Sequence, residues 1–266
     1  MTTKISFIVP VLNNSHGLQQ ALDSILSQAL LTVELIVIDG GSKDGTLEVI
    51  ESYKSHISYW ESGLDSGIAD AFNRGIAHAT GDIIGILNSD DILEPNALSH
   101  LMSAIEQMPT ADIYYGSIRY YDPQHQSSNI RHPHLSNMHK RMSIFHPAIF
   151  IRQSCYQKVG DYDCRYTHAM DSEWCHRAIA AGMKFHEVPA VLATMSLGGV
   201  SDIEYKQSLK QYRDSVIQHK LTKPLTAHFY YYFYLTVKAV MRLPFMRPIK
   251  LLRDRFLEVC HKTTPY

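Results

Sequence analysis

Two adjacent carboxylates are the residues of this sequence best suited to bind a metal ion. Asp90 and Asp91 directly follow the apolar run Ile83–Leu87, and no basic residue lies near them in the sequence. Adjacent carboxylates repel each other, and a hard divalent cation such as Mg²⁺ or Mn²⁺ relieves that repulsion. Such a cation keeps several waters and bridges one or two carboxylates to the phosphates of a ligand. The alternative is that Asp91 only caps the next helix.

Polar residues also follow two other apolar runs. The segments 10–14 and 39–44 come directly after Ile5–Val9 and Val33–Ile38. In an open parallel sheet, ligands bind beyond the carboxyl ends of the strands. If the three strands are neighbours, the polar segments and the aspartate pair line one crevice. The simpler interpretation is that loops are polar wherever they occur.

Other nucleotide- and metal-binding motifs are incomplete. The run GGSKDGT has the glycine spacing of a phosphate-binding P-loop but lacks its Lys-Ser/Thr ending, and no GxGxxG follows the first apolar run. His132, His134 and His139 do not have the spacing of a standard zinc site. These patterns disfavour a P-loop protein, a dinucleotide-binding protein and a zinc protein.

The elements that must position these side chains alternate between strands and helices over the first 120 residues. This alternation predicts βαβ units, and therefore an α/β fold with a Rossmann-like, mostly parallel central sheet flanked by helices and a helical C-terminal appendage. Residues 122–141 are polar and predict a loop or irregular strands. The predicted strands are Ile5–Val9, Val33–Ile38, Ile57–Trp60, Ile83–Leu87, Ile113–Tyr121, Ala148–Ile151 and Phe185–Val191. The predicted helices are Leu18–Ala29, a helix with Asp44 as its N-cap that ends at Ile50, Ile68–Ala79, Ala97–Met108, Ser172–Ala181 and Ile203–Gln218.

Charge is divided unevenly along the chain. The 266 residues are 45% hydrophobic with a net charge of −1, which is ordinary globular composition. Residues 1–112 carry 4 Lys/Arg and 15 Asp/Glu, whereas residues 113–266 carry 21 Lys/Arg and 11 Asp/Glu. The acidic half should repel nucleic acid and free phosphate unless its carboxylates hold a cation. The basic half suits an anionic surface or acceptor, and we expect no nucleic-acid partner.

The cysteines and the N-terminus indicate a reducing compartment. The four cysteines form no CxxC pair, which predicts free thiols. The N-terminal run MTTKISFIVPVLNN contains Pro10 and lacks a small-residue cleavage site, so it predicts a first strand and not a signal peptide. We expect a cytoplasmic protein.

Three motifs resemble one enzyme family. FIVPVLNN, ELIVIDGGSKDGT and LDSGIADAFNRGIAHATGDIIGILNSDD occur in the order and spacing of inverting family 2 glycosyltransferases of the GT-A fold. The resemblance covers roughly residues 4–200 and is strongest to bacterial enzymes of exopolysaccharide and lipopolysaccharide assembly. It implies a GT-A catalytic domain over 1–200, with a nucleotide-sugar-binding half over about 1–115 and an acceptor-binding half over 116–200. Residues 201–266 form the C-terminal extension.

The resemblance also assigns the donor site. It places Pro10 and Asn13 at the nucleoside and Asp39 at the base or ribose. Many relatives have a second acid after that aspartate, where this chain has Gly40, so uridine is only the default base. The segment with Asp65, Asp70, Asn73 and Arg74 is the donor-side wall, with Arg74 at a phosphate. In LNSDD, Asn88 replaces the leading aspartate of the DxD pattern, which leaves Asp90 near the ribose or metal and Asp91 as the direct Mn²⁺ or Mg²⁺ ligand.

The catalytic base of the family corresponds to Asp171, with Glu173 as the second candidate. The alternative for Asp171 is a helix N-cap. One base and one metal suffice for a displacement that inverts the anomeric centre, whereas a glycoside hydrolase needs two carboxylates flanking the bond. His146 resembles a position near phosphate or acceptor, with a structural histidine as the alternative. The segment Gly198–Ser201 resembles one that closes over the donor.

The C-terminal extension has a composition of its own. Residues 229–234 read FYYYFY, and residues 242–255 carry five basic residues and one acid. The apolar run is shorter than the about 20 residues needed to span a bilayer. Aromatic and basic residues together suit the membrane interface, which predicts peripheral binding at the inner face of the plasma membrane. The alternative is a helix packed on the catalytic domain or on a second subunit of a homodimer.

The predicted function is therefore metal-dependent, inverting transfer of a hexosyl or hexosaminyl group. The donor is a nucleotide-diphosphate sugar, with UDP as the default, and the acceptor is a hydroxyl of a carbohydrate or lipid-linked oligosaccharide. Two alternatives stay open: a sugar nucleotidyltransferase and a non-catalytic sugar-nucleotide-binding protein. The first normally has a basic, glycine-rich loop after its first strand, and VLNNSHG contains no basic residue other than a histidine.

Overall fold

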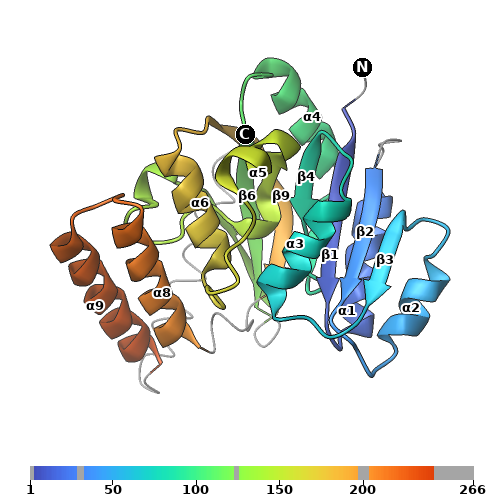
Figure 1. The fold of residues 1–266 in the computed structure, drawn as a ribbon, viewed down its shortest axis with the longest axis horizontal. Coiled ribbons are helices and arrows are strands. Elements are labelled where there is room, and N and C mark those ends of the chain that lie inside the picture. Colours follow the sequence, from blue (N-terminus) through green and yellow to red (C-terminus); the bar gives the residue numbers. More distant parts are fainter. Residues whose placement is uncertain (1–2, 29–32, 123–125, 197–203, 243–266) are drawn as a thin grey trace.

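The buried apolar runs form the strands of one mixed sheet (Figure 1). The structure is a computed structural model that describes residues 3–28, 33–122, 126–196 and 204–242. The strand order is β3-β2-β1-β4-β8-β6-β9-β5, and β7 pairs with β6. The strands are β1 (Ile5–Val11), β2 (Val33–Asp39), β3 (Tyr59–Ser62), β4 (Ile83–Ile86), β5 (Asp91–Leu93), β6 (Ile113–Asp122), β7 (Ser127–Arg131), β8 (Ile149–Arg152) and β9 (Phe185–Ser196).

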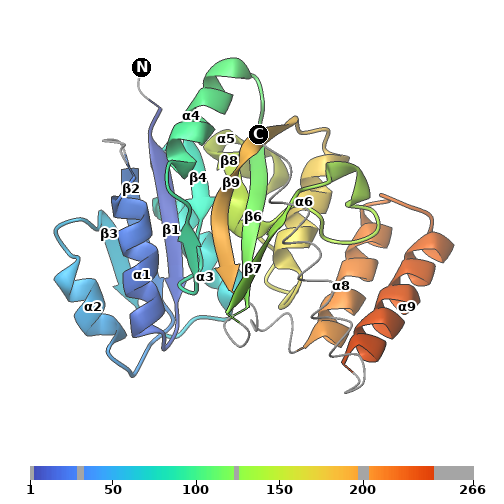
Figure 2. The same ribbon diagram turned by 180° about the vertical axis from the view of Figure 1, so that it is seen from behind.

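Helices cover both faces of the sheet, as the two opposite views show (Figures 1 and 2). Side chains alternate along β1, so Phe7 and Val9 join the apolar cluster with α1 and α4, whereas Ile8 joins the cluster with α3, α5 and α6. The helices are α1 (Ser15–Leu26), α2 (Thr46–Ser52), α3 (Ile68–His78), α4 (Ala97–Gln107), α5 (Gln153–Val159), α6 (Met170–Ala180), α8 (Tyr205–Gln218) and α9 (Pro224–Met241), with 3₁₀ turns η1 (Leu135–Asn137) and η2 (His146–Ala148).

The predicted α/β fold is confirmed. The alternation of strands and helices in the sequence corresponds to the parallel part of the sheet. Strands β3, β2, β1 and β4 all pair in parallel. Beyond β4 the sheet becomes mixed, because β8 runs antiparallel to both β4 and β6, while β6 and β9 are parallel. Parallel neighbouring strands need a crossover connection. The chain after β6 instead turns back through the β7 hairpin and the 3₁₀ turns, so β8 runs antiparallel to β6.

The boundaries differ from the sequence prediction in a few places. The polar region 122–141 contains the short strand β7, which agrees with the predicted loop or irregular strands, whereas β5 and α5 are additional short elements that periodicity did not reveal. The N-cap of α2 is Gly45, one residue after the predicted Asp44. The Asp44 carboxylate still accepts a hydrogen bond from the backbone N–H of Thr46 at 3.0 Å, so it stabilises the same helix start.

The predicted helical appendage is confirmed as the pair α8 and α9, which stands at one end of the molecule beyond α6 (Figures 1 and 2). Residues 243–266 lie outside the described part of the chain. Among the described residues, no helix combines the length and the apolar character needed to span a bilayer.

A buried carboxylate ties the amino ends of the parallel strands together. Glu34 accepts hydrogen bonds from Lys4 Nζ at 2.7 Å and from the backbone N–H of Thr80 at 2.7 Å, and Ser6 Oγ also donates to it. Burial alone would raise the pKa of Glu34, but the hydrogen bonds outweigh it and hold the pKa at about 2, below its ordinary 4.5. The folded state therefore favours the ionised carboxylate.

We expect Glu34→Gln to lower the free energy of unfolding by about 2 kcal/mol at neutral pH. Because the folded-state pKa of about 2 lies below the ordinary 4.5, this contribution is present above about pH 4.5 and is lost as the pH falls toward 2. Urea unfolding at pH 7 and pH 3 should show the difference between wild type and variant narrowing at the lower pH. Glu51→Gln, which breaks an ion pair whose two side chains are each 61% exposed, is the control and should change stability by less than about 0.5 kcal/mol. If wild type exceeded Glu34→Gln in free energy of unfolding by the same amount at both pH values, the lowered pKa of Glu34 would be contradicted.

Candidate active site

Two asparagines join the polar loops at the carboxyl ends of the parallel strands. Asn13 accepts a hydrogen bond from the backbone N–H of Lys43 at 2.8 Å, and its own N–H donates to Ser42 Oγ at 2.7 Å. Asn14 donates from its amide to the carbonyl of Ser89 at 3.1 Å. The loop after β1 is therefore bonded to the loops after both β2 and β4, and the structure brings the three predicted polar clusters together.

Asn14 also starts helix α1. Its Oδ1 accepts a hydrogen bond from the N–H of Gly17 at 3.1 Å, which is an N-cap interaction. A Cβ at Gly17 would lie 2.3 Å from the carbonyl oxygen of Ser89, so only glycine allows the helix to approach this loop so closely. Asn14 was not among the predicted site residues, although an asparagine before a helix is a recognisable capping signal.

Pro10 and Asp39 lie at the ends of β1 and β2. Pro10 is buried and pairs in register with Ile38. Asp39 is fully buried, and its carboxylate accepts hydrogen bonds from Ser62 Oγ at 2.6 Å and from the N–H of Ser42 at 3.1 Å. These contacts shape the loop after β2, and the contact of Asp39 with a base or ribose stays a prediction.

Gly40 has a steric explanation in this chain. A Cβ at this position would lie 2.9 Å from Oδ2 of Asp65. A second acid directly after Asp39 would also place its negative charge beside the Asp65 carboxylate. Glycine therefore avoids both the close contact and the charge repulsion.

The segment after β4 presents buried side-chain oxygens, one of which has no hydrogen-bond partner among the described residues. Asp91 is 2% exposed, and burial, followed by the negative charge of Asp90, raises the pKa of its carboxyl well above the usual range. The amide of Asn88 contacts Asp91 Oδ2 at 3.4 Å, while Asn88 Oδ1 is buried without a hydrogen-bond partner. Asp91 does not cap the next helix, because it lies in β5 and the N-cap of α4 is Asn96.

This set of oxygens fits a hard divalent cation. Two carboxylates and an amide oxygen are ligands of the kind that Mg²⁺ and Mn²⁺ prefer. Across the ranges that the structure describes, there is no group of three or more His, Cys, Asp or Glu side chains able to hold a metal. A cation at Asp90 and Asp91 would therefore depend on water and on oxygens of a ligand to complete its coordination.

Asp171 and His146 face a small cavity next to the end of β4. Asp171 lies in the first turn of α6, two residues after the N-cap Ala169, so the N-cap interpretation is wrong. With His146 and Ile86, the last residue of β4, Asp171 lines a cavity of about 10 Å³, roughly the space of one water. Burial lowers the pKa of His146, and the negative charge of Asp171 partly opposes this effect.

The His146 ring also has a structural partner. It stacks on Phe72 of α3 with ring centroids 5.0 Å apart and an interplanar angle of 7°. The structural interpretation and the site interpretation of His146 are thus compatible. The histidine is fixed by the stack and presented to the same cavity as Asp171.

Two other predicted site residues, Asn73 and Arg74, have partners within the protein. Asn73 pairs with both backbone groups of Tyr162, at 2.8 Å each. Arg74 contacts Glu61 at 3.4 Å and its own-helix neighbour Asp70 at 3.4 Å. These contacts give Asn73 a role in holding α3 to the loop before α6, and they direct the Arg74 guanidinium toward carboxylates.

Glu173 is enclosed in an ion pair. It is 1% exposed, and its carboxylate accepts hydrogen bonds from Arg177 at 2.8 and 3.0 Å and meets His219 Nε2 at 2.9 Å. Both of its oxygens are engaged by partners on α6 and at the end of α8, so we do not retain it as a candidate base or acceptor contact. Asp171 is the remaining candidate base. The predicted closing segment Gly198–Ser201 lies outside the described residues.

Comparison with known proteins gives one family. The family described as Glycosyl transferase family 2 matches residues 6–175, which is more than half of the chain. A PGL/p-HBAD biosynthesis glycosyltransferase of Mycobacterium bovis is 30% identical over 217 residues, covering 77% of this chain and 82% of that protein. An uncharacterized glycosyltransferase of Rickettsia typhi is 28% identical over 199 residues, covering 69% of this chain and 62% of that protein. The predicted resemblance to exopolysaccharide and lipopolysaccharide enzymes in particular is not confirmed by these relatives.

Solved structures share the fold at low sequence identity. A mannosyltransferase from Pyrobaculum calidifontis in complex with GDP-Man and Mn²⁺ has a TM-score of 0.65 and 18% identity, covering 97% of this chain and 85% of that one. S. aureus TarS 1-349 in complex with UDP-GlcNAc has a TM-score of 0.64 and 14% identity, covering 87% of this chain and 71% of that one. These similarities confirm the predicted GT-A fold.

The two roles of Asn14 can be separated by substitution. Asn14→Ala removes both the N-cap and the amide donor. We therefore expect the free energy of unfolding to fall by about 1 kcal/mol and the melting temperature to fall by about 2–4 °C. Asn14→Ser keeps a capping oxygen but lacks the amide that reaches Ser89, so its melting temperature should stay close to that of wild type. In both variants, hydrogen exchange of the backbone amides at 89–93 should become faster. Unchanged exchange at these amides would show that Asn14 does not hold the loop after β4.

Proposed function

The chain belongs to glycosyl transferase family 2 and is a glycosyltransferase, and from this premise we propose that it performs metal-dependent, inverting transfer of a hexosyl or hexosaminyl group. The donor in this proposal is a nucleoside-diphosphate sugar, with UDP as the default nucleotide. The acceptor is a hydroxyl of a carbohydrate or a lipid-linked oligosaccharide. The observation that carries the proposal is that the acidic pair Asp90–Asp91 follows the end of β4, while Asp171 shares a cavity with the last residue of that strand.

The donor side of the site has the oxygens that a cation-bound diphosphate needs. Asp91, Asp90 and Asn88 are the residues that would hold Mn²⁺ or Mg²⁺, which when bound neutralises the negative charge of the departing diphosphate. The solved structures with UDP-GlcNAc and with GDP-Man and Mn²⁺ support a nucleotide-sugar donor and a divalent metal. They carry different bases, so they do not favour uridine over guanosine.

The acceptor side provides one base. The acceptor hydroxyl oxygen attacks the anomeric carbon while the bond from that carbon to the diphosphate oxygen breaks, and the hydroxyl proton passes to Asp171. The Oδ1 atom of Asp171 accepts hydrogen bonds from Ser172. Among the described residues no group donates to Oδ2, so this oxygen is the one available for the proton. Attack on the face opposite the leaving group inverts the anomeric centre.

The state of the cysteines supports the predicted compartment. Cys155, Cys164 and Cys175 are free thiols in the described part of the chain. Free thiols persist where glutathione and thioredoxin keep proteins reduced. We therefore retain the cytoplasm as the proposed location of the reaction.

Replacing Asp91 should separate metal binding from stability. Burial and the negative charge of Asp90 both disfavour a charged side chain at position 91 and raise the pKa of Asp91, so the neutral Asp91→Asn variant should melt within about 2 °C of wild type without metal. The same variant should lose Mn²⁺-dependent affinity for UDP by more than about tenfold, as should wild type in EDTA. The matched control is Glu106→Gln, an exposed carboxylate on α4, which should bind like wild type. Calorimetric titration that finds UDP binding indifferent to Asp91→Asn and to EDTA would rule out the metal site.

Replacing Asp171 should separate donor binding from transfer. Asp171→Asn keeps the shape of the side chain but cannot accept the proton, so we expect turnover to fall by about 10²- to 10⁴-fold. Its affinity for UDP with Mn²⁺ should stay within about twofold of wild type, because Asp171 lies on the acceptor side. The control is Asp161→Asn, an exposed acid in the loop before α6. If Asp171→Asn turned over as fast as wild type, Asp171 could not be the base. If the wild-type protein bound donors but transferred no sugar, the non-catalytic alternative would be favoured.

A further inference from the structure

Helix α9 presents a continuous apolar face that no described element covers. Six large apolar residues of this helix are between 39% and 85% exposed. Their spacing of three, four and seven residues places them on one side of a helix. In the described chain, this side of α9 carries no charged residue. The residues of this outward face are Leu225 (85%), Phe229 (63%), Tyr232 (59%), Phe233 (49%), Val237 (40%) and Val240 (39%).

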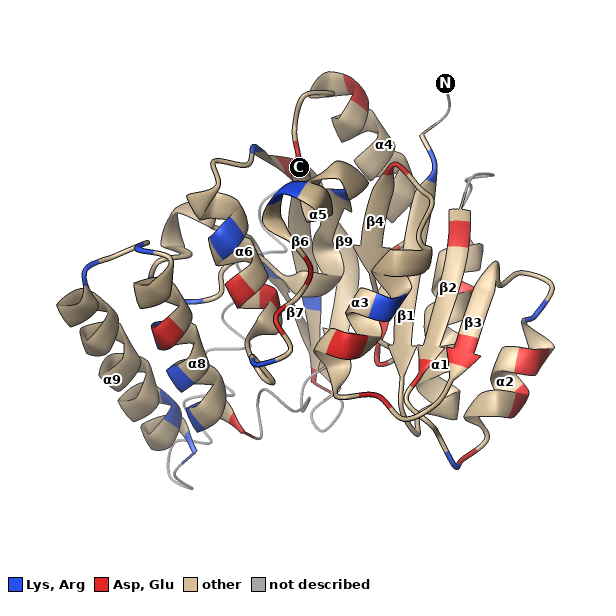
Figure 3. Ribbon diagram, viewed as in Figure 1, with Lys and Arg blue, Asp and Glu red and all other residues tan. Residues whose placement is uncertain are grey.

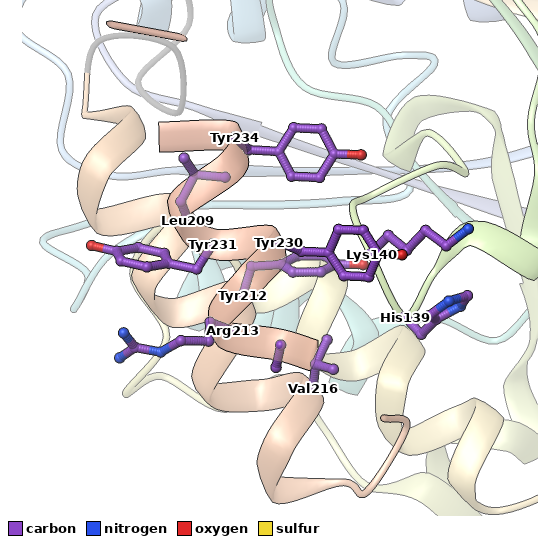
Figure 4. A pocket seen from close by; sticks show the side chains of 10 residues that line it. His139, Lys140, Leu209, Tyr212, Arg213, Val216, Tyr230, Tyr231 and Tyr234 are labelled. Carbon is purple, nitrogen blue, oxygen red and sulfur yellow. The ribbon is translucent and has the colours of Figure 1, made fainter. Parts of the chain in front are cut away.

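The opposite side of α9 is already packed. Ala227 is buried, and with Tyr230, Tyr231 and Tyr234 it lines the contact with α8 and with residues 139–140 (Figure 4). The cavity left at this contact measures only about 10 Å³. The inward face of α9 therefore holds the helix in place, and the outward face stays exposed in the described structure.

The two C-terminal helices that carry this apolar face are rich in basic residues. From the first residue of α8 to the end of the described chain, residues 205–242 contain seven basic side chains and one acidic side chain, Asp214. Lys220 and Lys223 are exposed just before α9, and Arg242 follows its last residue. The end of the molecule formed by α8 and α9 shows mainly basic residues, whereas acidic residues gather around α2, α3 and β1–β3 (Figure 3). The seven basic residues are Lys206, Lys210, Arg213, Lys220, Lys223, Lys238 and Arg242.

The helix pair is firmly attached to the helix that carries Asp171. Glu173 of α6 meets His219 at the end of α8 at 2.9 Å, and His176 Nδ1 of α6 contacts Ser215 Oγ of α8 at 2.8 Å. His176 is fully buried, and burial lowers its pKa to about 3, so this contact is made by a neutral ring. The orientation of α8 and α9 is thus fixed relative to the start of α6.

We propose that the outward face of α9 lies in the plane of an anionic lipid bilayer, with its apolar side chains at the level of the headgroups and the exposed Lys220 and Lys223, just before the helix, on the lipid phosphates. Aromatic and aliphatic side chains beside lysines suit this interface, and the helix does not need to cross the bilayer. A second copy of the chain is the less favoured occupant, because two such faces would bring their basic residues together. This inference concerns binding to a surface and does not depend on the proposed transfer reaction.

The proposal can be tested by sedimenting the full chain with lipid vesicles. Wild type should bind vesicles of phosphatidylcholine and phosphatidylglycerol at least about tenfold better than vesicles of phosphatidylcholine alone, and high salt should weaken this binding. Phe229→Ser with Phe233→Ser should lower the binding by about tenfold or more, since two aromatic side chains leave the headgroup region. Lys220→Gln with Lys223→Gln should lower it by about fivefold for each lost charge.

Each pair of substitutions has a matched control. Leu47→Ser with Met108→Ser removes two apolar side chains of 39% and 43% exposure from α2 and the C-cap of α4. Lys158→Gln with Lys184→Gln removes two exposed charges from the catalytic domain. Both control variants should bind vesicles like wild type. Thermal melts should confirm that all variants are folded. If the Phe229→Ser, Phe233→Ser variant is unfolded, Leu225→Ser replaces it, because Leu225 is the more exposed residue.

Three outcomes would overturn the proposal. The first is equal binding to charged and neutral vesicles, or no binding to either. The second is full binding by the folded Phe229→Ser, Phe233→Ser variant. The third is a wild-type dimer in sedimentation equilibrium that this variant abolishes, which would assign the face to a second copy. Binding of UDP and turnover are measured separately, so failure here leaves the proposed transfer reaction untouched.

Discussion

The arrangement of this protein centres on the carboxyl group of Asp91, which the fold buries without a positively charged partner among the described residues. Asp91 is enclosed in a short strand beside Asp90, and the nearest side-chain amide, Asn88, leaves its own oxygen unsatisfied. Burial of an ionised carboxylate is costly unless a cation or hydrogen bonds compensate it. The metal-free protein meets this cost by raising the pKa of Asp91, and a bound cation would meet it by coordination. This cost is the physical reason for the metal site that we propose at Asp90 and Asp91.

The loops around this charge are held by neutral amides. Asn13 and Asn14 bond the first loop to the other two, and Asn73 fixes α3 to the loop before α6. An asparagine supplies a donor and an acceptor without adding charge, so it can link loops in a region that is already strongly acidic. These bonds also span the two halves of the chain, because Asn73 and Tyr162 are 89 residues apart. The position of α3 relative to the loop before α6, the helix that carries Asp171, therefore depends in part on hydrogen bonds that carry no charge.

Charge is separated in space as well as in sequence. The acidic residues cluster at the end with the parallel strands, and the basic residues cluster at the end with α8 and α9 (Figure 3). A cation at the acidic end and an anionic surface at the basic end would each neutralise one half. Helix α6 connects the two ends, since its first turn carries Asp171 while Glu173 and His176 bind α8.

The sequence alone determined the α/β class, the parallel strands β1, β2 and β4, most of the helices and the candidates Asp90, Asp91 and Asp171. The fold features follow from apolar periodicity, and Asp90 and Asp91 stand out as adjacent carboxylates, so these are local and visible in one dimension. Asp171 was identified through the resemblance to family 2 glycosyltransferases. Only the tertiary structure decided that β8 runs antiparallel, that Glu173 is enclosed by Arg177 and His219, and that Asn73 binds the backbone of Tyr162. Those outcomes depend on which groups meet after folding, and a polar side chain far from its partner in sequence has the same appearance whether it will bind a substrate or satisfy a buried backbone amide. The outward face of α9 belongs to the same category, because aromatic residues in a helix reveal which side faces solvent only once the other side has packed.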